Sequence, residues 1–384
     1  MQSPFLSFFQ AGFECSTHRR CDGRRLDLIA STRHDRFAET DYRAVAQHGL
    51  RTVRDGVRWH LVERSPGVYD WSSFLPMLRA ARASGVQPIW DLCHYGYPDG
   101  LDIWRPAFVD RMAAFAAAVA RLVRDECPEP PIYCPVNEIS FWAWAGGDMA
   151  HFNPCTERRG MTLKIQLARA AIAVVQAVRD VDPGARIVHA DPAIHVVAAS
   201  AGDEDEAAHA HAAQYEAWDM LSGRLMPELG GRPEYLDILG LNYYSDNQWV
   251  LRGPTIERGH PSYRPFRDIL AQAYARYGRP MLVAETGAEG DARANWLRYV
   301  CGEVAAAIGA GVPVHGICLY PVLDYPGWAD DRHCPTGLFG PPDAGGRRPL
   351  CQPLAAEIER QAAIRTWHPG RVPQRGCGGR GGRP

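Results

Sequence analysis

IYCPVNEIS (132–140) and PMLVAETG (280–287) are the two stretches that decide the fold of this chain. Each is a short apolar run, typical of a strand buried on both faces of a parallel sheet. Each also contains a glutamate at or near its end, Glu138 in the first and Glu285 in the second. Because α/β barrels carry their functional side chains at the carboxyl ends of the strands, we expect both carboxyls at the same end of one sheet.

Six more apolar runs extend this pattern along the chain. The eight candidate strands cover residues 8–14, 52–58, 86–92, 132–138, 186–192, 236–244, 280–285 and 314–320. Residues 108–125 and 163–180 carry apolar side chains at helical spacing, which predicts outer helices between the strands. Eight alternations predict a closed (β/α)8 TIM barrel in a single domain, because closure leaves no strand edge unpaired. An open doubly wound sheet is the alternative, but it would more often carry a G-x-G-x-x-G turn after the first strand, and this chain has none there.

The expected boundaries follow from length and composition. The 384 residues, 46% of them hydrophobic, are enough for one large core. We assign the barrel to residues 1–365 and predict a disordered tail over 366–384, which is rich in Gly, Arg and Pro. Within the barrel, residues 200–211 are acidic and Ala-rich, which favours a solvated loop or helix start, and residues 245–265 are expected to form a long loop.

Charge and cysteine usage exclude several classes of partner. A net charge of -2 gives no broad field that would attract nucleic acid. There is no apolar run of about 18 residues and no leader segment, so we expect no membrane span and a cytoplasmic location. The 11 cysteines show no C-x-x-C spacing, which predicts reduced thiols. The segments HFNPC (151–155) and RHCPTG (332–337) have no recurring ligand spacing, so we expect no metal.

Two carboxyl groups that face one another are the working parts of a glycosidase. A retaining enzyme uses one as the nucleophile and a second, protonated one as the acid, about 5–5.5 Å apart. Glu138 and Glu285 follow the fourth and seventh strands, so they can converge from opposite walls of a barrel. Asn137, just before Glu138, is placed to hydrogen-bond a sugar hydroxyl. This chemistry needs no cofactor.

These segments resemble clan A of the glycoside hydrolases, and in particular family 1, the β-glucosidase family. The motif Asn137-Glu138-Ile139 is similar to the Asn-Glu-Pro motif of its acid/base, and Glu285-Thr286-Gly287 is similar to the Glu-Asn-Gly motif of its nucleophile. The resemblance extends to about residue 340 and implies a barrel that acts on carbohydrate.

Other segments strengthen the resemblance and imply roles for further residues. HYGYPDGL (94–101) is similar to the segment after strand three of the family, which implies that His94 binds a sugar hydroxyl. GLNYY (240–244) is similar to its strand six, so Asn242 and Tyr244 would belong to the site, with Tyr244 donating a hydrogen bond to the nucleophile. TVRDGVRW (52–59) is similar to its second strand, which implies Arg54 beside Glu285. Arg54 and Tyr244 would then stabilise the anionic form of Glu285, while Glu138, with fewer cationic neighbours, would keep its proton.

The chain departs from the family at the expected sugar-binding end. Tyr320 stands where the family has Trp, and Gly327 stands where it has a sugar-binding Glu, which puts glucose specificity in doubt. Trp328 follows directly and is expected at the site as an aromatic face for sugar C–H groups. Glu14 stands where the family usually has Gln, and we hypothesise that this charge favours a different epimer or an amino sugar.

The sequence thus predicts a retaining β-glycosidase that acts on an unspecified β-linked sugar. One alternative is a transglycosidase, for which Trp142, Trp144 and Trp249 would bind the acceptor. Another is a non-catalytic carbohydrate-binding barrel, whose natural signature would be loss of one carboxylate. Neither the oligomeric state nor the sugar follows from the sequence.

Overall fold

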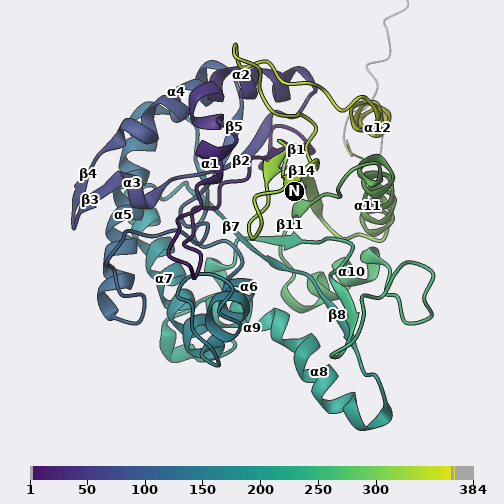
Figure 1. Cartoon of the computed structure of the whole chain (residues 1–384). Helices are drawn as coiled ribbons and strands as arrows, with labels where there is room; N and C mark the ends of the chain where they lie inside the picture. Colours follow the sequence, from purple (N-terminus) through teal and green to yellow (C-terminus); the bar gives the residue numbers. More distant parts are fainter. Residues whose placement is uncertain (1–2, 365–366, 368–384) are drawn as a thin grey trace, which may run out of the picture.

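Eight parallel strands close into a barrel in the computed structural model, which describes residues 3–364 and 367 (Figure 1). Their order around the barrel is β1-β2-β5-β6-β7-β9-β11-β12, with β12 pairing again with β1. The strands are β1 (Phe9–Gly12), β2 (Thr52–Gly56), β5 (Gln87–Asp91), β6 (Ile132–Cys134), β7 (Arg186–Pro192), β9 (Ile238–Asn242), β11 (Met281–Thr286) and β12 (Val314–Leu319). Each lies within one of the eight predicted segments or overlaps it, so the predicted (β/α)8 fold is confirmed.

Helices cover the outside of the barrel between successive strands (Figure 1). The outer helices are α2 (His34–Gln47), α4 (Leu75–Ala83), α5 (Pro106–Glu126), α7 (Gly160–Val181), α9 (Glu216–Leu221), α10 (Phe266–Tyr277), α11 (Ala292–Gly309) and α12 (Gln352–Ala362). Among the described residues, α7 is the one helix long and apolar enough to cross a membrane, and 61% of its apolar window is buried inside the structure. Because α7 packs along α5, its composition is that of a barrel helix.

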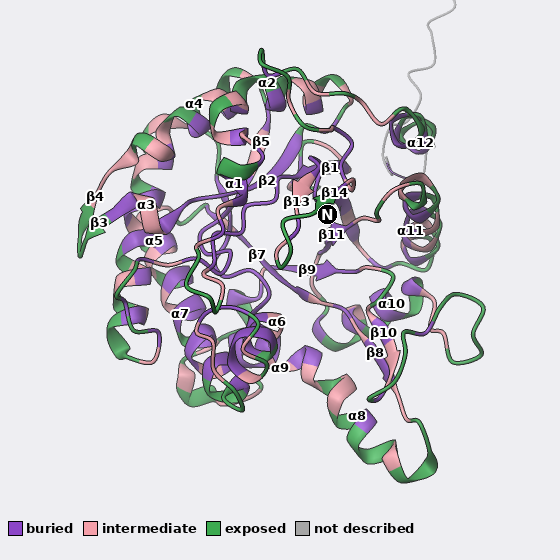
Figure 2. Cartoon of the chain, viewed as in Figure 1, coloured by how far each residue is buried: buried purple, intermediate pink, exposed green. Residues whose placement is uncertain are grey.

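Alternate side chains of the strands enter two separate apolar layers, as strand geometry requires. One set, which includes Val53, Trp90 and Tyr133, points outward and packs under the helices. A smaller inner cluster, which includes Ile89 and Leu282, fills the inside of the barrel. Figure 2 shows the buried strands at the centre and exposed positions on the outer helices. The filled interior leaves the carboxyl ends of the strands as the place where polar side chains gather.

The loops that connect the barrel strands and helices contain short strands and helices. The small sheets pair β3 (Glu63–Ser65) with β4 (Val68–Tyr69), β8 (His195–Val197) with β10 (Gln248–Val250), and β13 (Tyr325–Pro326) with β14 (His333–Cys334). Helix α8 (Glu204–Ala212) projects from the barrel, so the acidic segment 200–211 is largely helical. The expected loop 245–265 contains β10. The remaining short helices are α1 (Leu28–Ser31), α3 (Trp59–Val62) and α6 (Ile139–Trp142).

The predicted tail, residues 366–384, lies outside the described residues except for Trp367. The Trp367 side chain is buried, and its ring stacks on Phe8 at 4.4 Å between centroids. The indole N–H donates to the carbonyl of Gln361 at 2.7 Å. Trp367 is therefore packed against the barrel, and the boundary at residue 365 stays a prediction.

A disulfide joins Cys21 to Cys155, so the prediction of reduced thiols is wrong for this pair. The two residues are 134 positions apart, and the folded loops after β1 and α6 bring their Cα atoms to 5.6 Å. Spacing along the sequence carries no information about such an approach. Disulfides are typical of oxidising compartments. The cytoplasmic location expected from the sequence stays a prediction.

Breaking this bond is expected to destabilise the protein. We predict that Cys155→Ser lowers the free energy of unfolding by about 2–4 kcal/mol, because the cross-link closes a long loop of the unfolded chain. Urea unfolding with and without dithiothreitol would measure the change. Cys127→Ser, which removes a half-buried free thiol, is the matched control. Titration of 11 thiols in the denatured, unreduced protein would show that the bond does not form.

Candidate active site

Glu138 and Glu285 both lie at the carboxyl end of the barrel. Glu285 belongs to β11, and Glu138 lies at the start of α6, just after β6. The backbone of Glu138 is in the left-handed region, with φ of 47°, and its N–H donates to the carbonyl of Ala190 at 3.0 Å. Such a conformation is costly for a residue with a side chain and persists where the surroundings impose it, often at functional sites.

Two donors hold the carboxylate of Glu285. Arg54 Nη1 donates to Oε1 at 2.7 Å, and the Tyr244 hydroxyl donates to Oε2 at 3.0 Å. Burial and the charge of Glu285 raise the pKa of Tyr244 well above its ordinary value, so this hydroxyl stays protonated. The structure thus gives Glu285 one cationic and one neutral donor, which stabilise its anion.

Glu138 has a different environment. Its Oε1 accepts from Asn242 Nδ2 at 2.9 Å, and its Oε2 accepts from the Tyr95 hydroxyl. Burial, followed by the negative charge of Glu285, raises the pKa of Glu138 to about 8, while the donors Tyr95 and Asn242 act in the opposite direction. Glu138 therefore holds a proton at neutral pH.

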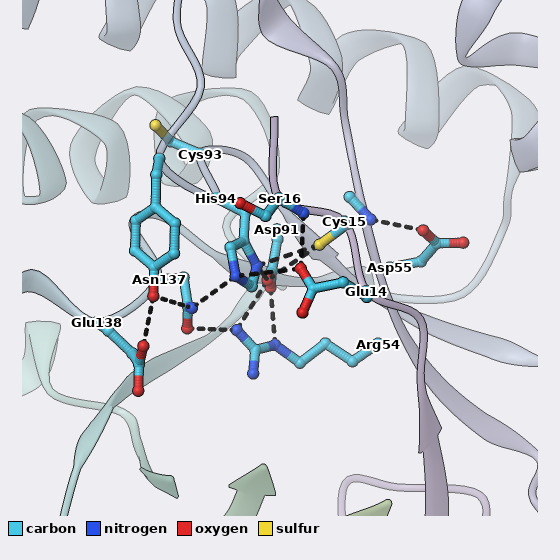
Figure 3. A network of polar contacts seen from close by, with 12 residues as sticks. Glu14, Cys15, Ser16, Arg54, Asp55, Asp91, Cys93, His94, Asn137 and Glu138 are labelled. Atoms are coloured by element: carbon cyan, nitrogen blue, oxygen red, sulfur yellow. Dashed lines mark hydrogen bonds and ion pairs between the residues drawn. The ribbon is translucent and has the colours of Figure 1, made fainter. Parts of the chain in front are cut away.

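Arg54, which donates to Glu285, also contacts Asn137, and Figure 3 shows Arg54 and Asn137 on the side of the site that holds Glu138. Arg54 is fully buried and donates to both oxygens of Asp91, at 2.9 and 2.8 Å, and to Asn137 Oδ1 at 2.6 Å. Asn137 Nδ2 contacts His94 Nε2 and the Tyr95 hydroxyl, each at 3.0 Å. With no exposed surface and its amide fully used, Asn137 does not face a substrate. The expectation that it binds a sugar hydroxyl is corrected to a supporting role.

His94 and Glu14 form the neighbouring wall. His94 Nδ1 lies 3.0 Å from Asp91 Oδ2. Glu14 Oε1 accepts from the backbone N–H of Ser16 at 2.9 Å and lies 3.9 Å from His94 Nε2. Burial raises the pKa of Glu14. Both side chains retain slight exposure, as do the two glutamates.

Tyr320 and Trp328, the two aromatic residues expected at the site, differ in burial. Tyr320 is buried, its ring lies 5.3 Å from the Arg54 guanidinium, and it packs on Gly12, where a Cβ atom would collide with the ring. Trp328 is half-buried, 4.7 Å from the ring of His18. With Tyr95, Phe141 and Phe152 it forms an aromatic cluster beside Glu138. Trp328 is therefore the residue of this pair that keeps exposed surface.

Three residues at this site were missed by the sequence analysis. Asp91, fully buried, anchors Arg54, and an acid inside the apolar run VQPIWDL was the available signal. Tyr95 donates to Glu138 from a left-handed backbone, with φ of 65°, for which the sequence offers no signal. Cys15 lies 3.2 Å from His94 Nδ1, and no motif surrounds it.

Cys15, Asp91 and His94 are also close enough to hold a metal ion, with their ligand atoms all within 4.8 Å. Two features argue against this use. Arg54 already occupies both Asp91 oxygens, and burial raises the pKa of the Cys15 thiol, whereas a metal ligand must be a thiolate. The expectation of a metal-free site stays a prediction.

The tryptophans expected to bind an acceptor differ in exposure. Trp142 is fully buried, with its indole N–H on the carbonyl of Asn153, so its assignment is corrected to a core residue. Trp249 lies on β10 and packs with the α8 segment. Trp144 is 48% exposed and packs on Phe141, a member of the aromatic cluster. Of the three, Trp144 alone combines large exposure with contact to the aromatic cluster beside Glu138.

Comparison with known proteins supports the fold. No protein-family sequence model matches the chain, and no curated protein sequence matches it. Solved structures do. They include a hyperthermophilic β-glucosidase mutant that forms a dodecamer in the crystal (TM-score 0.75, 16% identity, 93% of this chain and 100% of that chain).

The family 1 β-glucosidase of Thermotoga maritima is equally similar (TM-score 0.75, 15% identity, 95% of this chain and 100% of that chain). The same enzyme in complex with glucoimidazole has a TM-score of 0.75 at 15% identity, over 94% of this chain and 100% of that chain. The chain therefore has a glycosidase-like TIM-barrel fold, that of the family 1 β-glucosidases. The resemblance found in the motifs is confirmed at the level of the fold.

The hydrogen bond between Tyr95 and Glu138 predicts a change in pH dependence. Because the Tyr95 hydroxyl stabilises the ionised carboxylate, its removal makes Glu138 hold its proton more tightly. For Tyr95→Phe we expect the basic limb of kcat/KM, near pH 8 in the unaltered protein, to move upward by roughly one unit. Tyr97→Phe is the matched control on the same loop. A limb that moves downward or stays in place would contradict the assignment.

Proposed function

We propose that this protein is a retaining β-glycosidase in which Glu285 is the nucleophile and Glu138 the acid/base. The observation that carries this proposal is the contrast between the two carboxyls. Arg54 and Tyr244 stabilise the anion of Glu285, while burial and the charge of Glu285 keep Glu138 protonated. Two carboxyls whose surroundings separate their protonation states are suited to opposite roles in catalysis.

The reaction would proceed in two displacements. Glu285 attacks the anomeric carbon, the glycosidic C–O bond breaks, and Glu138 gives its proton to the leaving oxygen. Glu138, now ionised, then takes a proton from water, which attacks the anomeric carbon and releases Glu285. The sugar keeps its β configuration. This scheme requires no cofactor, and the substrate class is a β-linked carbohydrate, as for the β-glucosidases of the same fold.

Trapping of the covalent intermediate tests the proposal. A 2-fluoro glycoside with a good leaving group slows the second displacement, so the protein should gain the mass of one sugar on the peptide that contains Glu285. Label on another residue would reassign the nucleophile. Release of the α anomer from an unmodified β-glycoside, followed by NMR, would overturn the retaining mechanism. Product analysis with added sugar separates hydrolysis from transfer.

A further inference from the structure

Two hydrogen-bond acceptors at the candidate active site have no donor among the residues that the structure describes. Glu14 is 7% exposed, and its Oε1 accepts from the backbone of Ser16, but no donor among the described residues reaches its Oε2. Asn242 is almost fully buried. Its Nδ2 donates to Glu138, while its Oδ1 has no partner within the part of the chain that the structure describes. A ligand with several hydrogen-bond donors would therefore complement this site.

Arg54, the buried cation of this site, has no capacity left for Glu14. Its five N–H groups go to both oxygens of Asp91, to Glu285, to Asn137 and to the carbonyl of Ala284. His94 does not act as a cation for Glu14 in place of Arg54. Its Nε2 receives the amide of Asn137, and its Nδ1 lies against Asp91. Among the described residues, the one basic group within 4 Å of the Glu14 carboxyl is His94 Nε2, at 3.9 Å, so no arginine or lysine pairs with Glu14 there.

Glu14 lies within range of the charge of Glu285, which, after burial, contributes to the raised pKa of Glu14. Glu14 follows β1, which lies two strands from β11, the strand of Glu285, and three from β6, which precedes Glu138. A sugar bound between Glu138 and Glu285 would therefore meet Glu14 as a third carboxyl of the site.

We propose that Glu14 binds a protonated amino group on the sugar, so that this site selects glycosides of amino sugars. The proposal rests on the glycosidase function above and names its substrate class. An ammonium group supplies the missing positive charge and three N–H donors. A neutral sugar would leave a buried carboxyl without a cation, and such a group is costly unless it is paired or protonated, in line with the raised pKa of Glu14.

Calorimetric binding to the full-length protein tests the proposal without relying on turnover. The probes are 3-amino-3-deoxyglucose, 4-amino-4-deoxyglucose, their N-acetyl forms, and glucose. We expect at least one free amine to bind about tenfold or more tightly than glucose, because charge-assisted hydrogen bonds contribute about 1.5–3 kcal/mol. N-acetylation, which removes the charge, should abolish this preference.

Glu14→Gln should remove the preference for the amine, because the amide keeps the shape of the side chain but not its charge. Glu289→Gln, which removes an exposed acid after the same strand as Glu285, should keep it. Equal affinity of the unaltered protein for the amines and for glucose would overturn the proposal, whether or not Glu14→Gln folds. Binding of an amine without hydrolysis would leave this inference standing and refute the glycosidase function. Hydrolysis of β-glucosides with no preference for amines would do the reverse.

Discussion

Glu285→Gln is expected to reduce kcat by at least about a thousandfold while the protein keeps its thermal stability. The glutamine carbonyl can still accept the hydrogen bond from Arg54, and its NH2 group can donate to the Tyr244 hydroxyl oxygen in place of accepting from it, so residue 285 keeps its shape and both neighbours. What is lost is the anionic nucleophile, and the loss of a nucleophile removes most of the rate enhancement of an enzyme that forms a covalent intermediate. Rates on an activated aryl β-glycoside, with unfolding followed by circular dichroism, would measure both quantities.

The matched control is Glu289→Gln, four residues farther along the chain. Glu289 is exposed and pairs with Arg332 at the surface, so its loss should leave kcat unchanged within a factor of about two. A Glu285→Gln protein as active as this control, on every substrate that the unaltered protein hydrolyses, would favour a non-catalytic role for the pair and refute the proposed function.

Arg54→Met is expected to cause the largest loss of stability of any single substitution at the site. Arg54 is fully buried, and its removal leaves Asp91 and Glu285 as buried carboxylates without a cation. Breaking one partner out of a buried ion pair costs about 3–5 kcal/mol. Urea unfolding at pH 7 should show this loss, and the activity should fall with it because Glu285 loses its principal donor.

Two further variants test whether the loss of stability comes from the unpaired buried charges or from the removal of any arginine. Arg64→Met removes an exposed guanidinium that pairs with Asp70, and it should change the free energy of unfolding by no more than about 1 kcal/mol. Arg54→Met combined with Asp91→Asn should be less destabilised than Arg54→Met alone, because the second change removes one of the unpaired charges. Equal losses for Arg54→Met and Arg64→Met would contradict the account of the buried network.

The prediction from sequence succeeded where a motif carries the position of a residue. Arg54 was expected beside Glu285 because TVRDGVRW (52–59) is similar to the second strand of the family, and the structure places its guanidinium 2.7 Å from Glu285. It failed where a loop decides the position. Tyr95 reaches Glu138 only because its backbone is left-handed, and Asn137 turns inward because His94 and Tyr95 accept its amide hydrogens.

The amino-acid sequence by itself determined the eight alternations of strand and helix and the placement of Glu138 and Glu285 at the carboxyl ends of their strands. These features are local, since an apolar run and its period depend on neighbouring residues alone. Tertiary structure decided which donors each carboxyl meets, which acceptors stay without a partner, and which cysteines join. Those contacts link residues far apart in the chain, and their geometry is set by how the barrel closes and how its loops fold over it.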